Sequence, residues 1–445
     1  MYKNSKLSAF TLVEMMVAVA IMGILFMITI TSYSAVTRNA IGTALQSDLA
    51  NTSDQFKVYK ATYGSFPTTL DNKNCPVLPK ADVEYCITPS AGVIIKYNII
   101  NVKEFHMTAT KDGITYFISS KGTESVNVAD KDATCGTGYV WIPGSATYNT
   151  SDFCVMKYEA KIDTNGDGIG DTSQSTGYNT WPADAYPISS TRKLVSSAAG
   201  YPVANISQNI AIAAASNASY VSGCTTSCHL ISEAEWMTIA QNMISVPDNR
   251  ADASLDLVDG LSRFYSGHNN YHPDNALVAG PDSSPYFGTS YSATDTAREV
   301  SGTPNYTQRR TMYLTTGQVM WDFAGNVEEY TSGVASGSGS QPAVVGHNAY
   351  DGDWFDWYSV DQRGTNPISP FPQDATTIHE PDLWAWTRGM GAVYSSAIDS
   401  GTYSYVRSGA WDDCTVEGIF ELRLDHGTNE TDNGDMGLRV TKTLN

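Results

Sequence analysis

The sequence has little positive charge. Its 445 residues include 27 Lys and Arg against 46 Asp and Glu, which gives a formal net charge of -19. The deficit lies downstream, because residues 1–128 carry 11 basic and 9 acidic side chains and the remainder carries 16 and 37. Such an acidic surface repels phosphate backbones. We therefore expect no nucleic-acid partner, whereas calcium suits this surface.

Histidine and cysteine are scarce as well. The seven His are scattered and none has the His-Glu-x-x-His spacing of zinc proteases. The seven Cys form no tight four-ligand zinc pattern, although Cys224, Cys228 and His229 come nearest. Proximity along the chain instead predicts three disulfides and leaves Cys414 over: Cys75–Cys86, Cys135–Cys154 and Cys224–Cys228. Disulfides require an oxidising compartment; buried thiols are the alternative.

Charge is almost absent from the N-terminal segment. The 31 residues between Lys6 and Arg38 contain one charged side chain, Glu14. A run of this length spans a hydrocarbon core of ~30 Å, so we expect a transmembrane helix over residues 10–33, with Lys3 and Lys6 in the cytoplasm. A cleaved secretory signal is the alternative, but the run is too long for one and contains an acidic residue.

A short basic leader, Phe-Thr-Leu-Val-Glu and a long apolar helix follow one another here. This order resembles the class III signal of type IV pilins and pseudopilins. The resemblance implies that prepilin peptidase removes residues 1–9 by cutting between Ala9 and Phe10, and that Phe10 is then methylated. It also implies that Glu14 pairs with the amino terminus of a neighbouring pilin subunit. Ala9 stands where the family usually has Gly.

The resemblance to pilins continues to residue 122. Apolar positions keep helical spacing after the membrane segment, and residues 93–100 and 105–120 alternate as antiparallel strands do, with a turn at 111–113. We therefore expect a pilin-like domain over 10–122, in which the helix packs on a small antiparallel sheet. The next residues, 123–134, are polar and have no apolar period, which indicates a linker.

Four motifs follow in a fixed order downstream: residues 230–236, 325–330, 408–411 and 437–439. The first contains Ser232 and Glu235 at capping-box spacing, which predicts a helix start. Together the motifs resemble the formylglycine-generating enzyme family, also called the sulfatase-modifying factor domain. The resemblance implies a variant of the C-type lectin fold over residues 135–445, with much irregular structure. The expected fold class is α+β.

Oxidases of that family bind copper through two cysteines after the Gly-Gly-Ser motif. In this chain the matching positions fall at or near Asp413 and Gly418, and Cys414 is the only thiol in the segment. A single thiolate cannot make a paired soft-ligand site. We therefore expect neither copper nor formylglycine formation. An enzyme with an unrecognised site, secreted on a pseudopilin anchor, is the alternative function.

The segment 408–427 combines a regular frame with mixed polar residues. Apolar and charged residues alternate from Phe420 to Asp425, which predicts a half-buried strand with Glu421 and its charged neighbours outside. The frame resembles the variable region of diversity-generating retroelement proteins, here residues 408–439. In that family a reverse transcriptase rewrites codons at adenines. The resemblance implies a diversified ligand-binding face at Asp412, Asp413, Cys414, Val416, Arg423, Asp425 and His426. A fixed binding site and an ordinary strand are the alternatives.

Two calcium sites are expected. Hard oxygen ligands on a glycine-bent loop suit calcium, and residues 163–171 offer Asp163, Asn165, Asp167 and Asp171. The second site is implied by the resemblance to the formylglycine-generating family, at Asp322, the carbonyls of Gly325 and Val327, and Glu329. A plain surface loop and a turn capped by Asn326 are the respective alternatives.

These features together predict a surface receptor or adhesin on a pilin anchor. The chain would lie in the inner membrane before assembly and at the cell surface or in a pilus afterwards. Its partners would be prepilin peptidase, other pilin subunits, the membrane and an unknown surface ligand, protein or glycan. A structural pilin whose extra domain only spaces the filament is a further alternative.

Overall fold

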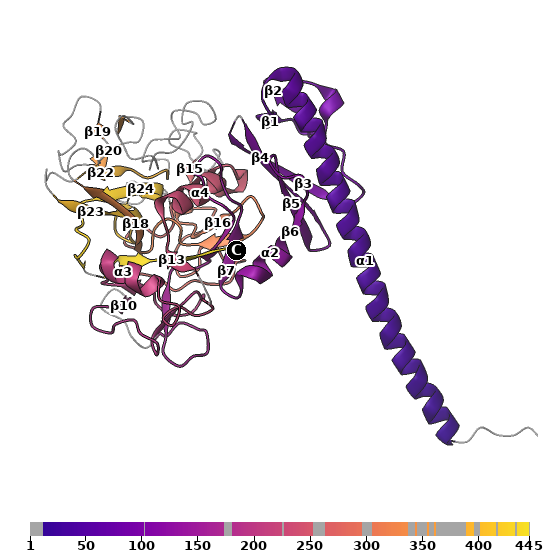
Figure 1. The fold of residues 1–445 in the computed structure, drawn as a ribbon, viewed down its shortest axis with the longest axis horizontal. Coiled ribbons are helices and arrows are strands. Elements are labelled where there is room, and N and C mark those ends of the chain that lie inside the picture. Colours follow the sequence, from indigo (N-terminus) through magenta and orange to yellow (C-terminus); the bar gives the residue numbers. More distant parts are fainter. Residues whose placement is uncertain are drawn as a thin grey trace, which may run out of the picture.

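The computed structural model describes residues 12–101, 103–172, 180–224, 227–251, 263–295, 305–336, 343–344, 354–355, 360–361, 389–395, 401–414, 417–431 and 434–444. A long N-terminal helix with a small sheet stands beside a larger body (Figure 1). The described helices are α1 Leu12–Tyr63, α2 Val128–Cys135, α3 Gln208–Ala215 and α4 Glu233–Ile244, with single 3-10 turns at Val83–Tyr85, Pro247–Asn249 and Asn305–Thr307.

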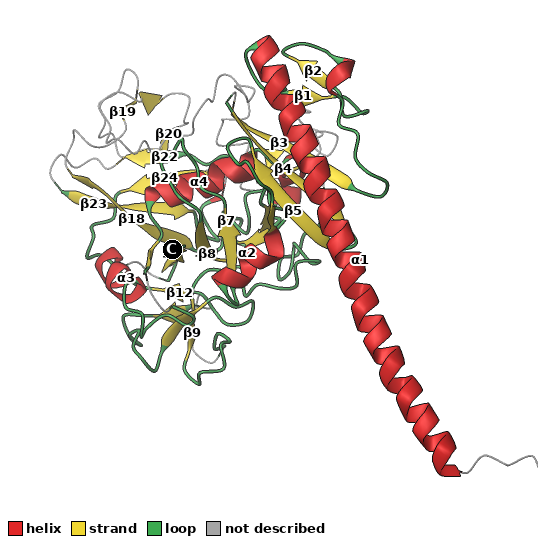
Figure 2. Cartoon of the chain, turned by 45° about the vertical axis from the view of Figure 1, so that its right-hand side comes forward, coloured by secondary structure: helices red, strands yellow, loops and turns green. Residues whose placement is uncertain are grey.

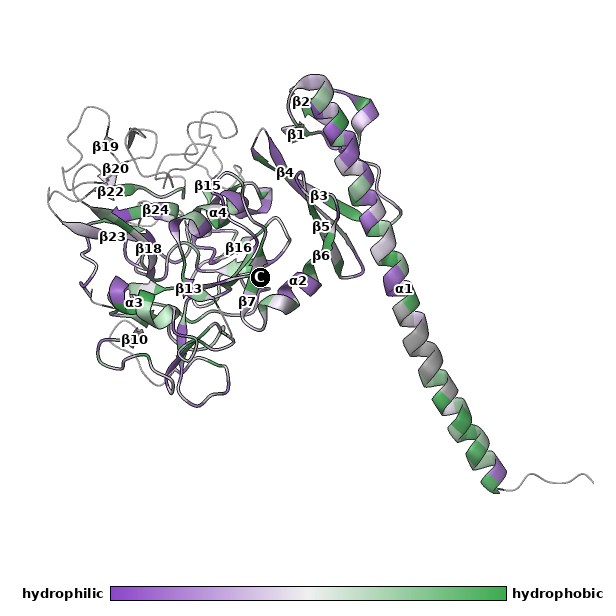
Figure 3. Ribbon diagram, in the orientation of Figure 1, coloured by the Kyte–Doolittle hydropathy of each residue, from purple (hydrophilic) through white to green (hydrophobic). Residues whose placement is uncertain are grey.

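Helix α1 has two halves with different surroundings. In the second half, Leu45, Leu49 and Phe56 are fully buried against the small sheet, at spacings that keep them on one face. The first half projects from the rest of the chain, and its residues are mostly hydrophobic (Figure 3). The helix ends at Tyr63, before Gly64 with φ 89°, as is common at helix C-termini.

The expected transmembrane helix over residues 10–33 is not shown. No helix among the described residues has both the length and the apolar character needed to cross a bilayer. The first two positions of that span, residues 10 and 11, lie outside the described part of the chain.

The small sheet has the order β3-β4-β5-β6 and is antiparallel throughout. Its strands are β3 Ile94–Asn101, β4 Glu104–Lys111, β5 Ile114–Ser119 and β6 Val126–Asn127. The predicted turn is confirmed, because Lys111 pairs with Ile114 across the two-residue loop of Asp112 and Gly113. Their φ values of 49° and 76° are those a tight hairpin turn requires.

Both faces of this sheet are covered. Phe105, Met107 and Ala109 on β4 pack toward α1, while the alternate residue His106 faces the body. His106 Nδ1 lies 2.9 Å from Thr315 Oγ1 in a buried hydrogen bond. The sheet thus lies between α1 and the body (Figure 1). A strand covered on both sides buries all of its central residues, which explains why the polar positions of β4 are buried too.

The expected linker over residues 123–134 is wrong, because these residues belong to the packed structure. Residues 126–127 form β6, and α2 begins directly after them with Asn127 as its N-cap, whose side chain accepts from Ala129 N–H. Val128 packs into one apolar cluster with Phe117 of the small sheet and Trp141 of the body. The polar sequence pattern predicted a linker, but the buried side chain of Val128 and the N-cap at Asn127 attach this segment to the folded structure.

The body contains two larger sheets. One has the order β13-β26-β8-β7 and is antiparallel; the other, of six strands, has the order β20-β22-β24-β23-β18-β25, with β22–β24 and β18–β25 parallel. The four strands are β13 Cys228–Leu230, β26 Val440–Thr443, β8 Phe153–Met156 and β7 Tyr139–Ile142. The six are β20 Trp354–Phe355, β22 Val393–Ser395, β24 Gly418–Leu424, β23 Thr402–Ser408, β18 Glu328–Ser336 and β25 Met436–Leu438.

The remaining strands form two-stranded pairs. They are β1 Thr69–Leu70 with β2 Pro76–Leu78, β9 Lys161–Asp163 with β11 Lys193–Val195, β10 Trp181–Pro182 with β12 Val203–Ala204, β14 Arg250–Ala251 with β15 Arg263–Phe264, β16 Thr311–Tyr313 with β17 Val319–Trp321, and β19 Ala343–Val344 with β21 Val360–Asp361. Loops make up much of the body (Figure 2), in agreement with the expected mixture of helix, antiparallel sheet and irregular structure.

Two further local predictions are confirmed. Helix α4 starts with the expected capping box, in which Ser232 accepts from Glu235 N–H and the Glu235 side chain accepts from Ser232 N–H. The three predicted disulfides are all formed: Cys75–Cys86, Cys135–Cys154 and Cys224–Cys228. Cys414 takes part in none of these disulfides.

Candidate functional site

Two of the sequence motifs hold each other through backbone hydrogen bonds. Gly325 N–H donates to the Ser408 carbonyl over 2.9 Å, and Trp411 N–H donates to the Asn326 carbonyl over 3.2 Å. Asn326 and Ser408 both have left-handed backbone conformations, with φ of 79° and 86°. Such conformations are uncommon outside glycine. The 325–330 and 408–411 motifs therefore form one braced unit.

The other two motifs join this unit through side chains. Trp236 on α4 is fully buried and its Nε1 donates to the Ile419 carbonyl at the start of β24 over 2.9 Å. Arg439, which follows β25, lies fully buried with Nη2 2.7 Å from Glu329 Oε1. All four motifs, far apart in the sequence, meet around β18 and β24.

Glu328 and Glu329 begin β18 and point to opposite faces of the sheet. Glu329 is bound by Arg439, while Glu328 Oε1 lies 2.5 Å from Arg423 Nη1 on β24. Burial raises the pKa of both carboxyls, and the guanidinium partners oppose that rise. The Arg423 pair thus links the 325–330 motif to the segment predicted to bind a ligand.

The positions predicted to bind a ligand lie in the turn before β24 and at the end of β24, and Glu328 connects the two groups, because it pairs with Arg423 and one of its oxygens lies within 4.8 Å of an Asp413 oxygen. Asp412, Asp413 and Cys414 lie in the turn after Trp411 and are half-buried. Arg423 and Asp425 are also half-buried, whereas His426 is buried; Val416 lies outside the described residues. Arg423 Nη2 donates to Asp425 Oδ2 over 3.2 Å, and His426 Nε2 lies 3.4 Å from Asp425 Oδ1. The structure thus brings six of the seven positions into one region.

The prediction that the charged side of β24 faces outward is wrong in part. Glu421 is only 1% exposed, and its carboxyl lies against Gly409, where a Cβ would be 2.3 Å from Glu421 Oε2. Residues 389–391 run beside the start of the strand, and Phe420 N–H donates to the Met390 carbonyl. A Cβ at Gly418 would lie 2.3 Å from the Gly389 carbonyl oxygen. The alternation does exist, since Phe420 and Leu422 are buried on the other face. A strand inside a six-stranded sheet can be covered on both sides, which alternation alone does not reveal.

Four carboxyl groups meet beneath the turn 411–414. One side-chain oxygen each from Glu328, Asp413 and Glu421 lies within 4.8 Å of the others, the single such acidic group found in the described part of the chain. Glu417 is fully buried beside them, and neither of its side-chain oxygens has a hydrogen-bond partner within the described ranges of the chain. Glu417 was not predicted from the sequence, where its only signal is an acidic residue directly before Gly418.

The pKa of each carboxyl in this group is raised. Burial raises those of Glu417 and Glu421 well above the usual range, and the charge of Asp413 raises both further. Burial also raises the pKa of Asp413, although the Arg423 charge opposes this. Asp412, at the rim, reaches a pKa of about 6 through burial and the neighbouring Asp413. The site therefore concentrates carboxyl groups where water is largely excluded, and burial favours their neutral forms.

In the predicted calcium loop, the carboxylates are turned toward the loop's own backbone. Asp163 Oδ1 accepts from Gly166 N–H over 2.7 Å and Asp163 Oδ2 from Gly168 N–H over 2.8 Å. Asn165 Nδ2 donates to Asp167 Oδ2, and Asp171 Oδ2 accepts from Thr164 N–H and Oγ1. These bonds define a tight loop in which the acidic oxygens do not converge. Calcium here stays a prediction.

The second predicted calcium set is held by arginines. Asp322 is bound on both oxygens by Arg310 at 2.7 Å each, and Glu329 is bound by Arg439. The Gly325 carbonyl accepts from Ser408 Oγ over 3.3 Å, and the Val327 carbonyl remains only a predicted ligand. The alternative, a turn capped by Asn326, describes the local bonding: Asn326 Oδ1 accepts from Leu277 N–H over 2.7 Å.

The position matching the second copper cysteine has no room for a thiol. A Cβ at Gly418 would also lie 2.3 Å from Gly391 N. Backbone atoms cannot yield as a flexible side chain can, so a cysteine at 418 would require the strand to move. The absence of copper chemistry itself stays a prediction.

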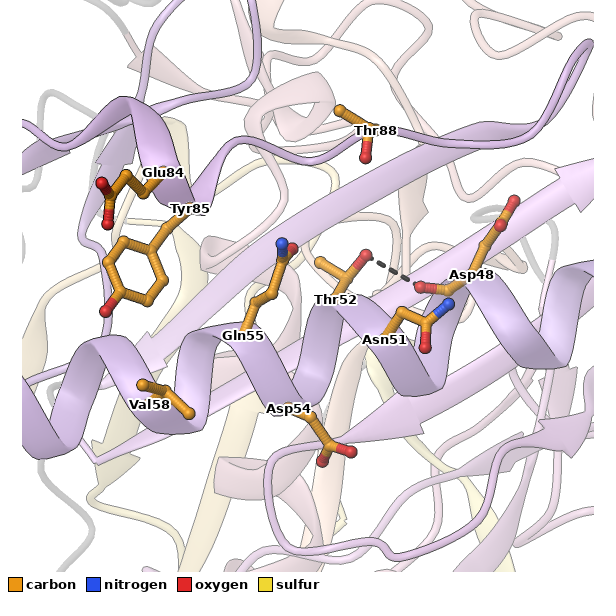
Figure 4. A pocket seen from close by; sticks show the side chains of 9 residues that line it. All are labelled: Asp48, Asn51, Thr52, Asp54, Gln55, Val58, Glu84, Tyr85 and Thr88. Atoms are coloured by element: carbon orange, nitrogen blue, oxygen red, sulfur yellow. Dashed lines mark hydrogen bonds between the residues drawn. The ribbon is translucent and has the colours of Figure 1, made fainter.

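A separate surface hollow of about 640 Å³ lies on the pilin-like part, between α1 and the segment 84–88. Figure 4 shows Asp48, Asp54 and Gln55 of α1 among its lining side chains, with Glu84 and Tyr85 opposite. It is far along the chain from the four motifs. The processing residues Ala9 and Phe10 lie outside the described chain, while Glu14 lies in the first turn of α1.

Comparison with known proteins supports the N-terminal prediction. The prokaryotic N-terminal methylation motif matches residues 4–30. No curated protein matches the chain. Among solved structures, the chain is similar to Treponema denticola variable protein 1, with 11% identity and a TM-score of 0.27, over 76% of this chain and 98% of that one. A TM-score this low establishes no shared fold, so the C-type lectin fold stays a prediction.

Proposed function

We propose that the chain is a pilin-like subunit that carries a ligand-binding domain as a surface receptor or adhesin. The methylation motif at 4–30 supports the pilin-like part. The observation that carries the proposal is the projecting half of α1, where Leu12, Met16 and Phe26 are 77%, 65% and 66% exposed. A helix that is hydrophobic all round is normally buried. Helices of neighbouring pilin subunits would bury it, and a membrane would do so before assembly.

The attachment of the body suits display. Because the small sheet packs between α1 and the body, the body would follow the helix as a rigid unit and stand on the outside of a filament. A flexible linker would leave its orientation free. The exposure of the region 411–427 on the outside of a filament is part of the same proposal.

The ligand-binding face would be the rim formed by the turn 411–414 and the end of β24. Half-exposed charged groups there, above all Asp412 and Arg423, offer polar contacts to a protein or a glycan. The frame residues Trp411, Phe420 and Leu422 are buried, so rim residues could change without loss of the core. Exchange of these residues by a diversity-generating retroelement belongs to the same proposal. A near-copy of codons 409–439 beside a reverse-transcriptase gene would support it, and a locus with neither would contradict it.

The filament part is tested in producing cells with the full chain. We expect the chain in the sheared filament fraction, and we expect Glu14→Leu to keep it in the cell fraction. Glu84→Gln, an exposed acidic residue elsewhere in the pilin-like part, is the control. Equal amounts of wild type and Glu14→Leu in the filament fraction would contradict the pilin-like role.

The binding part is tested on a printed glycan array and a displayed peptide library, with filaments that carry the full chain. Asp412→Ala should remove the signal that wild type gives, while Asp130→Ala on α2 should keep it. Binding that persists in Asp412→Ala would move the ligand face elsewhere on the body. An enzyme on a pseudopilin anchor is the second candidate, favoured by the raised pKa values of the clustered carboxyls. An enzymatic activity of the wild-type chain that is lost in Asp412→Ala would support this second candidate.

A further inference from the structure

Carboxyl groups outnumber cationic side chains in the interior beneath the turn 411–414. The carboxyl groups of Glu328, Asp413, Glu417 and Glu421 come from β18, from the turn, and from the start of β24. Glu328, Glu417 and Glu421 are at most 1% exposed. Burying several like charges together is costly unless each is paired or coordinates a metal.

The cations near this group are largely used by other acidic residues. Arg423 pairs with Glu328 but also with Asp425. Arg407 lies close by, yet its Nη2 is 2.5 Å from Glu233 and its Nη1 donates to the carbonyls of residues 420 and 421. The guanidinium groups therefore leave part of the carboxyl charge unbalanced.

The oxygen atoms that remain are buried and have no hydrogen-bond partner among the residues that the structure describes. They are both side-chain oxygens of Glu417, Oε2 of Glu421 and Oε2 of Glu328. A buried carboxylate oxygen without a donor loses its hydration and gains nothing in return. Other buried acids of this chain have donors: Asp322 and Glu329 are bound by arginines, and Glu159 accepts from Asn326 Nδ2 and Val327 N–H. Four oxygens without a donor in one place therefore indicate a missing positive partner rather than a packing defect.

The geometry also suits a shared partner. One oxygen each of Glu328, Asp413 and Glu421 lies within 4.8 Å of the others. Calcium binds oxygens at about 2.3–2.6 Å, so two of its ligands can lie up to about 5 Å apart. Glu417 reaches the same place across Gly409, where a Cβ would lie 2.3 Å from Glu417 Cγ and 2.3 Å from Glu421 Oε2. Glycine at 409, with φ 80°, leaves room for both side chains.

We propose that Glu328, Asp413, Glu417 and Glu421 bind a divalent cation, and that the cation is calcium. Carboxylate oxygens are hard ligands, which select calcium, magnesium or manganese over softer metals. Calcium tolerates an irregular set of carboxylates, whereas magnesium demands near-octahedral geometry and keeps several waters. Glu417 and Glu421 belong to neither of the calcium sets expected from the sequence.

The cation would connect three segments that the rim depends on. It would tie β18 to the turn 411–414 through Glu328 and Asp413, and both to β24 through Glu417 and Glu421. Arg423 would keep its pair with Glu328 beside the metal. Calcium would thereby order the rim without touching the ligand itself, which goes beyond the proposed binding function and does not require it.

Terbium, which replaces calcium at oxygen sites and is sensitised by nearby indole rings, gives a direct test on the purified full chain after removal of metals with EDTA. Trp411 lies two residues from Asp413. We expect one sensitised terbium equivalent that calcium displaces and magnesium does not. The titration is done in an Asp163→Asn/Asp167→Asn background, so that the loop 163–171 does not contribute.

The test variants are Glu417→Gln and Glu421→Gln, which keep size and remove charge, with the surface variant Glu430→Gln as control. We expect Glu417→Gln and Glu421→Gln to lose the sensitised terbium ion and the control to keep it. Melting temperature provides a second measure, because a bound ion stabilises the folded state. In EDTA the two variants should melt above wild type, since repulsion is relieved; in calcium they should melt below it.

If the carboxyls had a purely structural role, the variants would change the melting temperature in the same direction in EDTA and in calcium. Changes in opposite directions therefore indicate a metal site. Wild type that shows no calcium-dependent melting and no sensitised terbium would overturn the proposal and leave the carboxyls protonated. Retention of the terbium equivalent in Glu417→Gln and Glu421→Gln would overturn it as well. Neither result bears on filament assembly or ligand capture, so the proposed function would be judged separately.

Discussion

His106 of the small sheet and Thr315 of the body are joined by a buried hydrogen bond of 2.9 Å between Nδ1 and Oγ1. Thr315 Oγ1 also lies 2.8 Å from Asn242 Nδ2 of α4, so the contact reaches from the small sheet into the core of the body. Phe117 and Trp141 pack beside it with ring centroids 5.3 Å apart. The pilin-like part and the body are therefore expected to unfold together.

Phe117→Ala tests this coupling. Removal of the ring leaves a cavity between the small sheet and the body, and should lower the free energy of unfolding by about 3–5 kcal/mol. Denaturant unfolding of the full chain, followed by tryptophan fluorescence for the body and by circular dichroism for α1, should move both signals together. Val83→Ala, at an exposed position, serves as control. Two separate transitions, of which only one moves, would contradict the coupling.

Arg439→Met should be strongly destabilising. It removes the partner of the fully buried Glu329, and a broken buried pair costs about 3–5 kcal/mol. The double variant Arg439→Met/Glu329→Gln should recover much of this loss, because no unpaired charge then remains. Chemical denaturation of the four chains in a double-mutant cycle measures the coupling. A double variant no more stable than Arg439→Met would show that the carbonyl contacts of Arg439 matter more than its ion pair.

The pair of His229 and Glu235 predicts a dependence of stability on pH. Burial opposes charge on His229, but the hydrogen bond to Glu235 and its charge raise the pKa of His229 above 6.5. Burial likewise opposes charge on Glu235, yet His229 and the capping box lower the pKa of Glu235 below 4.5. Stability from His229 is present below its unfolded pKa and is lost as pH rises through the folded pKa. Stability from Glu235 is present above its unfolded pKa and is lost as pH falls through the folded one.

The contribution of the pair should therefore be greatest between about pH 4.5 and pH 6.5. His229→Gln should lower the melting temperature most in this window and progressively less toward alkaline pH. The measurement is a series of melting curves of wild type and variant across the range. A difference that does not vary with pH would assign the effect to packing of the ring instead of its charge.

Gly418→Ala should destabilise the start of β24. Its Cβ would lie 2.3 Å from the Gly389 carbonyl oxygen and from Gly391 N, and overpacking typically costs about 1–3 kcal/mol. Gly122→Ala, where the nearest atom to the new Cβ is the Ser119 carbonyl oxygen at 3.4 Å, should be nearly neutral. Melting temperatures of the two variants decide the point. Equal stability of both would show that the segment 389–391 yields easily.

N-terminal processing is checked by mass spectrometry of the chain from producing cells. The motif at 4–30 predicts a mature chain that begins with methylated Phe10. Ala9→Gly, the residue usual in the family, should be cut at least as completely as wild type, while Ala9→Leu should leave the precursor intact because a small residue is needed at the cut. A wild-type chain that retains residues 1–9 would contradict the prediction.

The sequence by itself determined the features that depend on neighbours in the chain. The hairpin at Asp112 and Gly113, the capping box of Ser232 and Glu235, and the three disulfides were all predicted from residues at most 19 positions apart. The methylation motif is local in the same way. Backbone conformation and short-range bonding decide such features, so residue type and spacing were sufficient.

Only the tertiary structure decided which polar groups are buried and what binds them. Residues 123–134 look like a linker, yet Val128 joins a core built from Phe117 and Trp141. Glu421 lies on the charged side of an alternating strand, yet its carboxyl is buried against Gly409. The carboxyl cluster joins β18 to β24 across about ninety residues of chain. The packing of the whole domain decides which distant segment covers a strand. The periodicity of residues along that strand therefore cannot predict the covering segment.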